Sequence, residues 1–196
     1  NDEDIHTKTA SQVFKIPIEK VTPLMRSRAK AVNFGIIYGI SDYGLSRDLN
    51  IPRKEAKQYI DNYFNNYDKV KEYMENIVDR CKEIGYVETI LNRRRYVPEL
   101  KSRNFNIRSF GERIAMNTPI QGSAADIIKV AMVRIFDELN KRKLKSKLIL
   151  QVHDELIIET HRDELEQVKN LVKDVMENCI ELNVPLKVDL KVGDNW

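Results

Sequence analysis

The sequence has little of what would indicate a secreted, membrane-bound or zinc-containing protein. It holds two cysteines and three histidines in 196 residues, and it contains no HExxH motif and no paired CxxC motifs. Neither a disulfide framework nor a zinc site is therefore indicated. No long apolar run marks a signal peptide or a membrane span. Position 1 is not methionine, and we expect the chain to be a piece of a longer protein. Its 42% hydrophobic residues fit a globular chain of one domain or two small lobes.

The sequence also lacks a strong excess of either charge, because its 33 basic residues nearly balance its 30 acidic ones. The distribution along the chain is uneven. Residues 91–113 contain seven basic and two acidic side chains, residues 141–147 five basic and none acidic, and residues 160–181 three basic and six acidic. Basic stretches favour an anionic partner on one face, since cations neutralise phosphates. A solvated, lysine-rich surface explains the same pattern equally well.

Apolar residues recur at three- and four-residue spacing in several segments, which predicts amphipathic helices. Thr22 and Pro23 offer an N-cap and a proline at the first helical position. The expected helices cover residues 22–38, a segment beginning near Pro52, residues 68–81 with an end near Gly85, a segment from about Ser123 to the lysine-rich stretch, and residues 165–180.

Strands are fewer than helices. The β-rich runs are residues 86–90, 95–97, 147–152, 155–159 and 186–192. We expect the first two to form a small hairpin and the next two a second hairpin with His153 and Asp154 at its tip. The last run should add a third strand to that C-terminal sheet. The predicted class is α+β, with helices dominating.

The helix that begins at Pro23 carries an unusual polar stripe. Two cations and two aromatic residues follow one another four apart: Arg26, Lys30, Phe34 and Tyr38. At roughly 100° per residue such positions form one slowly winding line along a helix. The stripe could bind a phosphate chain at one end and stack on a base at the other. Gly35 and Gly39 strengthen that interpretation, because a helix interior accepts glycine where something approaches its backbone closely. The alternative is a surface cation pair that leads into a buried aromatic pair.

The tip of the second hairpin is a candidate metal site. Asp154 and Glu155 are adjacent carboxylates, and Mg²⁺ prefers oxygen ligands of this kind. Neighbouring residues of a strand point to opposite faces, so the two are not expected to be equal ligands. An ordinary polar hairpin tip explains the same residues.

A third pattern places long hydrogen-bond donors at four-residue intervals, at Arg113, Asn117 and Gln121. Such a row could contact the acceptors of a nucleic-acid minor groove. Pro119 should disturb a continuous helix here, and an ordinary helix surface is the alternative.

Taken together and in this order, the three patterns closely resemble family A DNA polymerases, the bacterial DNA polymerase I group. The resemblance extends over essentially the whole chain. It is carried by Ile5-His6, Arg26-x3-Lys30-x3-Phe34-Gly35-x2-Tyr38-Gly39, Gly85-Tyr-Val-Glu-Thr, Arg93-Arg-Arg-Tyr, Arg113-x3-Asn117-x3-Gln121-Gly122-x3-Asp126, Gln151-Val-His153-Asp154-Glu155 and Gly193-Asp-Asn-Trp196. It implies a mostly helical fingers subdomain and part of a palm with a small antiparallel sheet covered by helices. Residues 1–21 would form a junction helix, residues 22–107 the fingers and residues 108–196 the C-terminal part of the palm.

The resemblance also implies a role for the polar stripe. Arg26 and Lys30 would hold the triphosphate of a dNTP, and His6 would add a contact from outside the helix. Phe34 would stack on the sugar and base, and Tyr38 would lie at the templating position. Closure of this helix around a correct pair would add fidelity.

The other two patterns would serve the DNA and the metal ions. Primer-template DNA would be contacted by Arg113, Asn117, Gln121 and, near the primer end, His153. Asp154 would be one of two aspartates that hold two Mg²⁺ ions for nucleotidyl transfer to the primer 3′-hydroxyl. Glu155 would be an accessory carboxylate, so that the catalytic residues would be Asp154, Glu155 and Lys30.

The family's other metal-binding aspartate and its thumb have no counterpart in this sequence. We therefore expect a fragment that is inactive alone, from a monomeric bacterial enzyme that is cytoplasmic, nucleoid-associated and without a membrane partner. Two alternatives remain. One is an enzyme like the single-subunit RNA polymerases, which share the Arg/Lys and Tyr-Gly helix. The other is a nucleic-acid-binding relic without chemistry.

Overall fold

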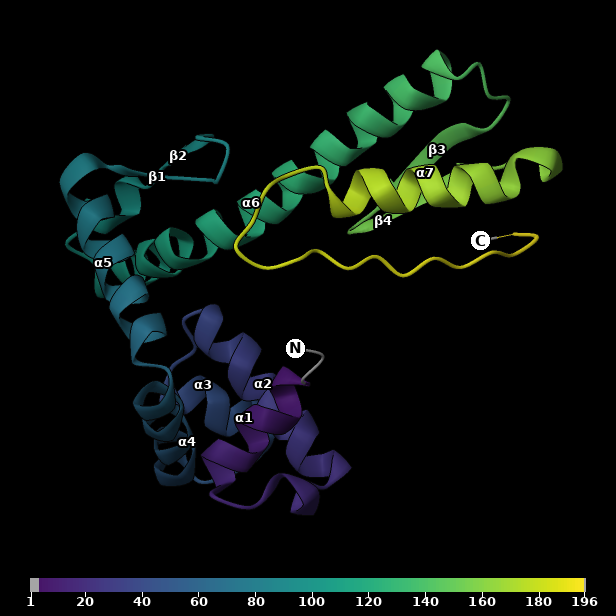
Figure 1. The fold of residues 1–196 in the computed structure, drawn as a ribbon. Coiled ribbons are helices and arrows are strands. Elements are labelled where there is room, and N and C mark those ends of the chain that lie inside the picture. Colours follow the sequence, from purple (N-terminus) through teal and green to yellow (C-terminus); the bar gives the residue numbers. More distant parts are fainter. Residues whose placement is uncertain (1–3, 196) are drawn as a thin grey trace. The chain divides into compact units, whose positions relative to one another are not determined.

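The structure is a computed structural model that describes residues 4–195 (Figure 1). Residues 1–3 and 196 lie outside the described residues, and with them the start of the predicted junction segment and Trp196 of the last resembling motif. The chain divides into two compact units. Among the described residues, the first contains residues 4–88 together with residues 92–120, and the second contains residues 89–91 and 121–195.

The first unit is built mainly from helices that cross one another (Figure 1). Its elements are α1 (Ile5–Phe14), η1 (Ile18–Lys20), α2 (Pro23–Ile37), α3 (Asp42–Leu49), α4 (Arg53–Asn66), α5 (Asp68–Ile84), β1 (Tyr86–Glu88), β2 (Arg94–Tyr96), η2 (Pro98–Lys101) and the first part of α6 (Phe105–Lys141). Strands β1 and β2 pair antiparallel, with Tyr86 opposite Tyr96. The structure confirms the helices predicted at residues 22–38, from near Pro52 and at residues 68–81 with an end near Gly85, and it confirms the predicted small hairpin.

Local signals in the sequence set the ends of these helices. The Thr22 hydroxyl accepts a hydrogen bond from the Met25 N–H at 3.3 Å, and Pro23 occupies the first turn of α2. Helix α5 ends at Gly85, which adopts φ = +84° and donates its N–H to the Cys81 carbonyl at 2.8 Å. Glycine reaches this left-handed conformation without a steric penalty.

Two apolar clusters hold the first unit together. The first lies among α1 to α4 and contains the fully buried Val32, Ile36 and Leu45, with Tyr59 and Tyr63 beside them. The second joins α5, the small hairpin, η2 and α6. Its members are Val78, Cys81, Val87, Val97, Leu100, Ile114 and Ala115. Burial of this apolar surface, rather than helix propensity, provides most of the stability of such helices.

The second unit combines a two-stranded sheet with helices. Its elements are residues 121–141 of α6, β3 (Lys147–Val152), β4 (Glu155–Glu159), η3 (Arg162–Glu164) and α7 (Leu165–Glu177). The strands are antiparallel, with Val152 opposite Glu155, so the predicted hairpin with His153 and Asp154 at its tip is confirmed. One face of α6 packs against α7 through a buried cluster formed by Ile135, Leu139, Val168, Leu171 and Val172.

The helix expected from about Ser123 begins much earlier, at Phe105, and continues through Pro119. The prediction that Pro119 would disturb a continuous helix is therefore wrong. A proline inside a helix removes one backbone hydrogen bond and costs ~3 kcal/mol. Burial on both flanks offsets this cost, since Ala115 is buried in the first unit and Ile135 in the second. Tertiary contacts outweigh the local preference here.

The prediction of a third strand at residues 186–192 is also wrong. Within residues 4–195 the C-terminal sheet has two strands, and residues 186–192 are extended without belonging to either sheet. The Val188 N–H donates to Glu177 Oε1 at 3.1 Å. This backbone donor is thus satisfied by a side chain at the end of α7 instead of by a neighbouring strand.

The predicted class is confirmed, because the described chain is mostly helical with a small antiparallel sheet. No helix between residues 4 and 195 is both long enough and apolar enough to span a membrane.

Candidate functional site

The polar stripe predicted on α2 is present in the first unit. The Lys30 ammonium lies 5.9 Å from the centre of the Phe34 ring, and the Phe34 and Tyr38 rings are 6.2 Å apart at 22° to one another. Phe34 and Tyr38 are 42% and 41% exposed. The aromatic residues are therefore available to a ligand and do not form the buried pair of the alternative interpretation.

Helix α1 adds His6 to this stripe. The His6 ring lies 5.7 Å from the Phe34 ring, and its Nδ1 atom is 2.9 Å from the Asn33 side-chain amide nitrogen. Burial lowers the pKa of His6; the Asp4 carboxylate opposes this shift, and the Arg26 and Lys30 cations add to it. A histidine with a lowered pKa is mainly neutral at pH 7.

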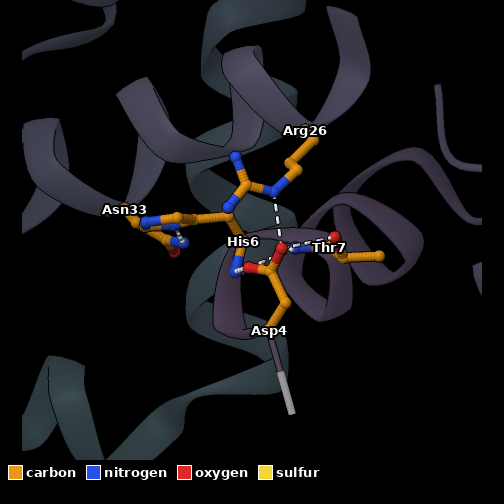
Figure 2. A network of polar contacts seen from close by, with 5 residues as sticks. All are labelled: Asp4, His6, Thr7, Arg26 and Asn33. Carbon is orange, nitrogen blue, oxygen red and sulfur yellow. Dashed lines mark hydrogen bonds and ion pairs between the residues drawn. The ribbon is translucent and has the colours of Figure 1, made fainter. Parts of the chain in front are cut away.

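A second contact between the two helices fixes Arg26. Figure 2 shows the Asp4 carboxylate between the N-terminus of α1 and the guanidinium of Arg26, with Nε and Oδ2 2.5 Å apart. Asp4 also caps α1, since its carboxylate accepts hydrogen bonds from the backbone N–H groups of His6 and Thr7 and from the Thr7 hydroxyl. The hydrogen bond from Arg26, with smaller help from these donors, holds the pKa of Asp4 well below its usual range.

Sequence reasoning missed Asp4 and Asn33. Asp4 could have been found, because aspartate directly before a helical pattern is a typical N-cap. Asn33 gives a weaker signal: it is a polar residue, 6% exposed, that lies between Val32 and Ile36 on the buried side of α2. Its partner is on another helix, and spacing within α2 cannot identify it.

The two glycines of the α2 motif are explained by contacts inside the first unit. A Cβ atom added to Gly35 would lie 2.8 Å from Ile40 Cγ2. Gly39 follows α2 with φ = +71°, and a Cβ there would lie 2.5 Å from Met116 Cε and 3.0 Å from Arg113 Cγ. The close approach expected of these glycines is therefore made by the chain's own side chains.

The predicted row on α6 is continuous, because the helix passes through Pro119. Arg113 is exposed and its guanidinium lies 5.9 Å from the Phe110 ring. The Asn117 side-chain oxygen is buried and has no hydrogen-bond partner among residues 4–195. Arg113 and Asn117 belong to the first unit, whereas Gln121 is exposed at the start of the second.

The three remaining predicted residues lie together in the second unit, at the tip between β3 and β4. His153, Asp154 and Glu155 are all exposed. His153 adopts φ = +53°, and its carbonyl accepts a hydrogen bond from the Gln151 amide at 2.8 Å. Nowhere in residues 4–195 do three or more His, Cys, Asp or Glu side chains gather as a metal site. The two carboxylates suit Mg²⁺ in ligand type, but they supply only part of a coordination shell.

The model of DNA polymerase family A matches residues 1–196.

The chain belongs to DNA polymerase family A.

Curated relatives of this family A chain are named DNA polymerase I. The chain is 58% identical to the one from Bacillus caldotenax over 195 residues, and 59% identical to the one from Bacillus subtilis over 196 residues. These alignments cover 100% of the chain and 22% of each relative. The family A chain thus spans about a fifth of the length of the curated relatives it matches.

A solved relative extends the comparison to three dimensions. It is described as the POL domain of Pol1 from M. smegmatis in complex with DNA primer-template and dNTP. The likeness has a TM-score of 0.90 at 45% sequence identity, and it covers 94% of the family A chain and 33% of the solved one.

Proposed function

We propose that this chain provides the nucleotide-binding helix and part of the catalytic palm of a polymerase that carries out template-directed DNA synthesis. The observation that carries the proposal is the cluster on the exposed face of α1 and α2, where His6, Lys30 and Phe34 lie close together and Tyr38 stacks beside Phe34. A dNTP combines a polyphosphate, a sugar and a flat base, and this face offers cations and aromatic rings in the matching order. In this proposal residues 1–21 are the junction, 22–107 the fingers and 108–196 part of the palm.

Each residue of the cluster has a separate task. Arg26 and Lys30 bind the triphosphate, and Lys30 stabilises the charge that develops on the departing pyrophosphate. His6 donates a hydrogen bond to a phosphate oxygen. Phe34 stacks on the sugar and base, and Tyr38 occupies the templating position until a nucleotide arrives.

The DNA is held by long polar side chains from α6. Arg113, Asn117 and Gln121 can reach the acceptors that every base pair presents in the minor groove, so they bind without reading sequence. For Asn117 the amide nitrogen would make this contact, because its side-chain oxygen can only accept hydrogen bonds. His153 lies beside Asp154 at the hairpin tip and contacts the primer end.

Asp154, with Glu155 as an accessory carboxylate, would hold divalent metal. In the complete enzyme two Mg²⁺ ions would activate the primer 3′-hydroxyl and stabilise the pyrophosphate. Because the tip supplies only part of a coordination shell, the metal ions need further ligands, and in this proposal another part of the polymerase provides at least one further carboxylate. The catalytic activity therefore belongs to the longer polymerase.

The comparisons support this proposal at the level of the whole enzyme. Relatives named DNA polymerase I share the full length of the chain, and the solved relative was bound to primer-template and dNTP. The bacterial sources of the relatives support a cytoplasmic, nucleoid-associated enzyme. A monomeric state stays a prediction. The family assignment also favours DNA synthesis over RNA synthesis, which a comparison of dNTP and rNTP incorporation would test.

Lys30→Ala in the complete polymerase tests the proposal against a relic that only binds nucleic acid. Loss of a hydrogen bond to a charged group costs ~1.5–3 kcal/mol, so kcat/KM for dNTP should fall roughly 10- to 100-fold. The affinity for primer-template should stay unchanged. Lys20→Ala, at an exposed lysine of η1 in the same unit, is the matched control. Equal losses of nucleotide use and DNA binding would support the relic instead.

A further inference from the structure

Asn33 makes a directional contact with His6. Its side-chain nitrogen lies 2.9 Å from His6 Nδ1, and Asn33 is 6% exposed on the inner side of α2 (Figure 2). An amide NH₂ group can only donate hydrogen bonds, so Nδ1 must accept in this contact. In a neutral imidazole the other nitrogen then carries the proton. The contact therefore places an N–H group at Nε2.

The tautomer matters because the ring is neutral near pH 7. The groups facing His6 are the Asp4 carboxylate on its own element and the Arg26 and Lys30 cations on α2. Burial and the two cations lower the pKa of His6 in spite of Asp4. A neutral ring can either donate or accept at Nε2, and only the donating form attracts a phosphate oxygen.

We propose that Asn33 is a positioning residue that holds His6 as the Nε2–H tautomer, so that His6 donates a hydrogen bond to a nucleotide phosphate. This inference rests on the proposed function. Asn33 does not touch the nucleotide and acts only through His6. With the opposite tautomer the Nε2 lone pair would face the phosphate oxygen and repel it.

Asn33→Asp separates this role from a structural one, because the carboxylate that it introduces can accept a hydrogen bond but cannot donate one. This carboxylate should hold the proton of His6 at Nδ1 and raise the pKa of the ring. In its charged form the ring still donates from Nε2, whereas in its neutral form it presents a lone pair there. The KM for dNTP of the variant should therefore be near that of wild type at low pH and rise as the ring loses its proton.

The experiment measures the ratio of variant to wild-type KM for dNTP at each pH from about 6 to 9, in the complete polymerase, with kcat recorded separately. We expect the ratio to rise about tenfold across this range, which corresponds to the loss of one hydrogen bond to a charged group. In a His6→Gln background, Asn33→Asp should change KM by the same factor at every pH, because the residue through which it acts is absent. A pH-independent ratio in the presence of His6 would overturn the proposal.

A direct readout does not depend on activity or on the stability of the variant. Nitrogen NMR of wild-type polymerase labelled in histidine distinguishes the two tautomers, and His6→Gln identifies the resonance. A proton on Nε2 is expected, and a proton on Nδ1 would refute the inference. If the polymerase incorporates no dNTP while the proton is on Nε2, the proposed function fails and the assigned tautomer stands.

Discussion

Asp4 Oδ2 lies 2.5 Å from Arg26 Nε, so the residue that caps α1 also holds the first cation of the α2 stripe. One carboxylate therefore both caps α1 and positions Arg26, which we propose to bind the triphosphate. The two tasks can be separated by mutation, because asparagine caps a helix as well as aspartate does but carries no charge.

Asp4→Ala should loosen the first turn of α1, whereas Asp4→Asn should not. The backbone N–H groups of His6 and Thr7 lose their acceptor only in the alanine variant. We expect their hydrogen exchange in the complete polymerase to accelerate roughly threefold or more in Asp4→Ala. Equal acceleration in Asp4→Asn would mean that the ion pair with Arg26, and not the cap, orders this turn.

Tyr59 should make the first unit sensitive to alkaline pH. Burial, followed by the hydrogen bond to Glu55, raises the pKa of Tyr59 to about 12. A raised folded-state pKa gives a contribution to stability that is complete below the ordinary tyrosine pKa and is lost as the pH rises toward 12.

Tyr59→Phe should therefore make the free energy of unfolding fall less steeply between about pH 10 and 12. At neutral pH the variant should be about 1 kcal/mol less stable, because the hydrogen bond to Glu55 is lost. Alkaline unfolding followed by circular dichroism measures both effects. Tyr43→Phe removes an exposed hydroxyl and is the control. An unchanged alkaline slope in Tyr59→Phe would contradict the assignment.

Gly111→Ala should destabilise the protein although alanine is the better helix former. A Cβ atom at position 111 would lie 2.9 Å from Glu99 Cβ and 3.0 Å from the Leu100 backbone nitrogen. Backbone atoms of η2 cannot move aside as a flexible side chain can, so overpacking should cost ~1–3 kcal/mol.

The gain in propensity from glycine to alanine is only about 1 kcal/mol. Ala124→Gly, at an exposed position of the same helix, measures that propensity effect alone. Thermal unfolding of both variants decides the question. A higher melting temperature for Gly111→Ala would show that a Cβ atom at position 111 does not clash with η2.

Asp154→Asn in the complete polymerase should reduce primer extension at least ~100-fold, because an amide is a poorer ligand for a hard cation than a carboxylate. Glu155→Gln should reduce primer extension by a smaller factor, since its role is accessory. Asp48→Asn replaces an exposed acid on α3 and controls for the change in net charge.

The 196-residue chain by itself should extend no primer. Robust incorporation of dNTP by it would disprove the proposal that further metal ligands lie elsewhere in the polymerase.

The parts of the fold that sequence could predict are those set by neighbours along the chain. Thr22 and Pro23 determine the start of α2, and four-residue spacing identifies its polar stripe. The tip at His153 and Asp154 follows from two β-rich runs that are separated by only these two residues.

The parts that sequence could not predict depend on contacts between distant residues. Pro119 remains helical because both flanks are buried by tertiary packing. The extended segment around Val188 bonds to Glu177 instead of a strand. Asn33 and His6 are 27 positions apart and on different helices. Neither propensity nor periodicity carries information about such pairs.

The two buried thiols make this chain convenient for site-specific labelling. Cys81 is 1% exposed and Cys179 is 3% exposed, and burial raises the pKa of Cys81. Thiol-reactive dyes need an accessible thiolate, so a single cysteine introduced at a surface position of α2 would react well before either native one. A fluorophore placed there could report nucleotide-dependent movement of α2, and Cys81 and Cys179 would not have to be replaced first.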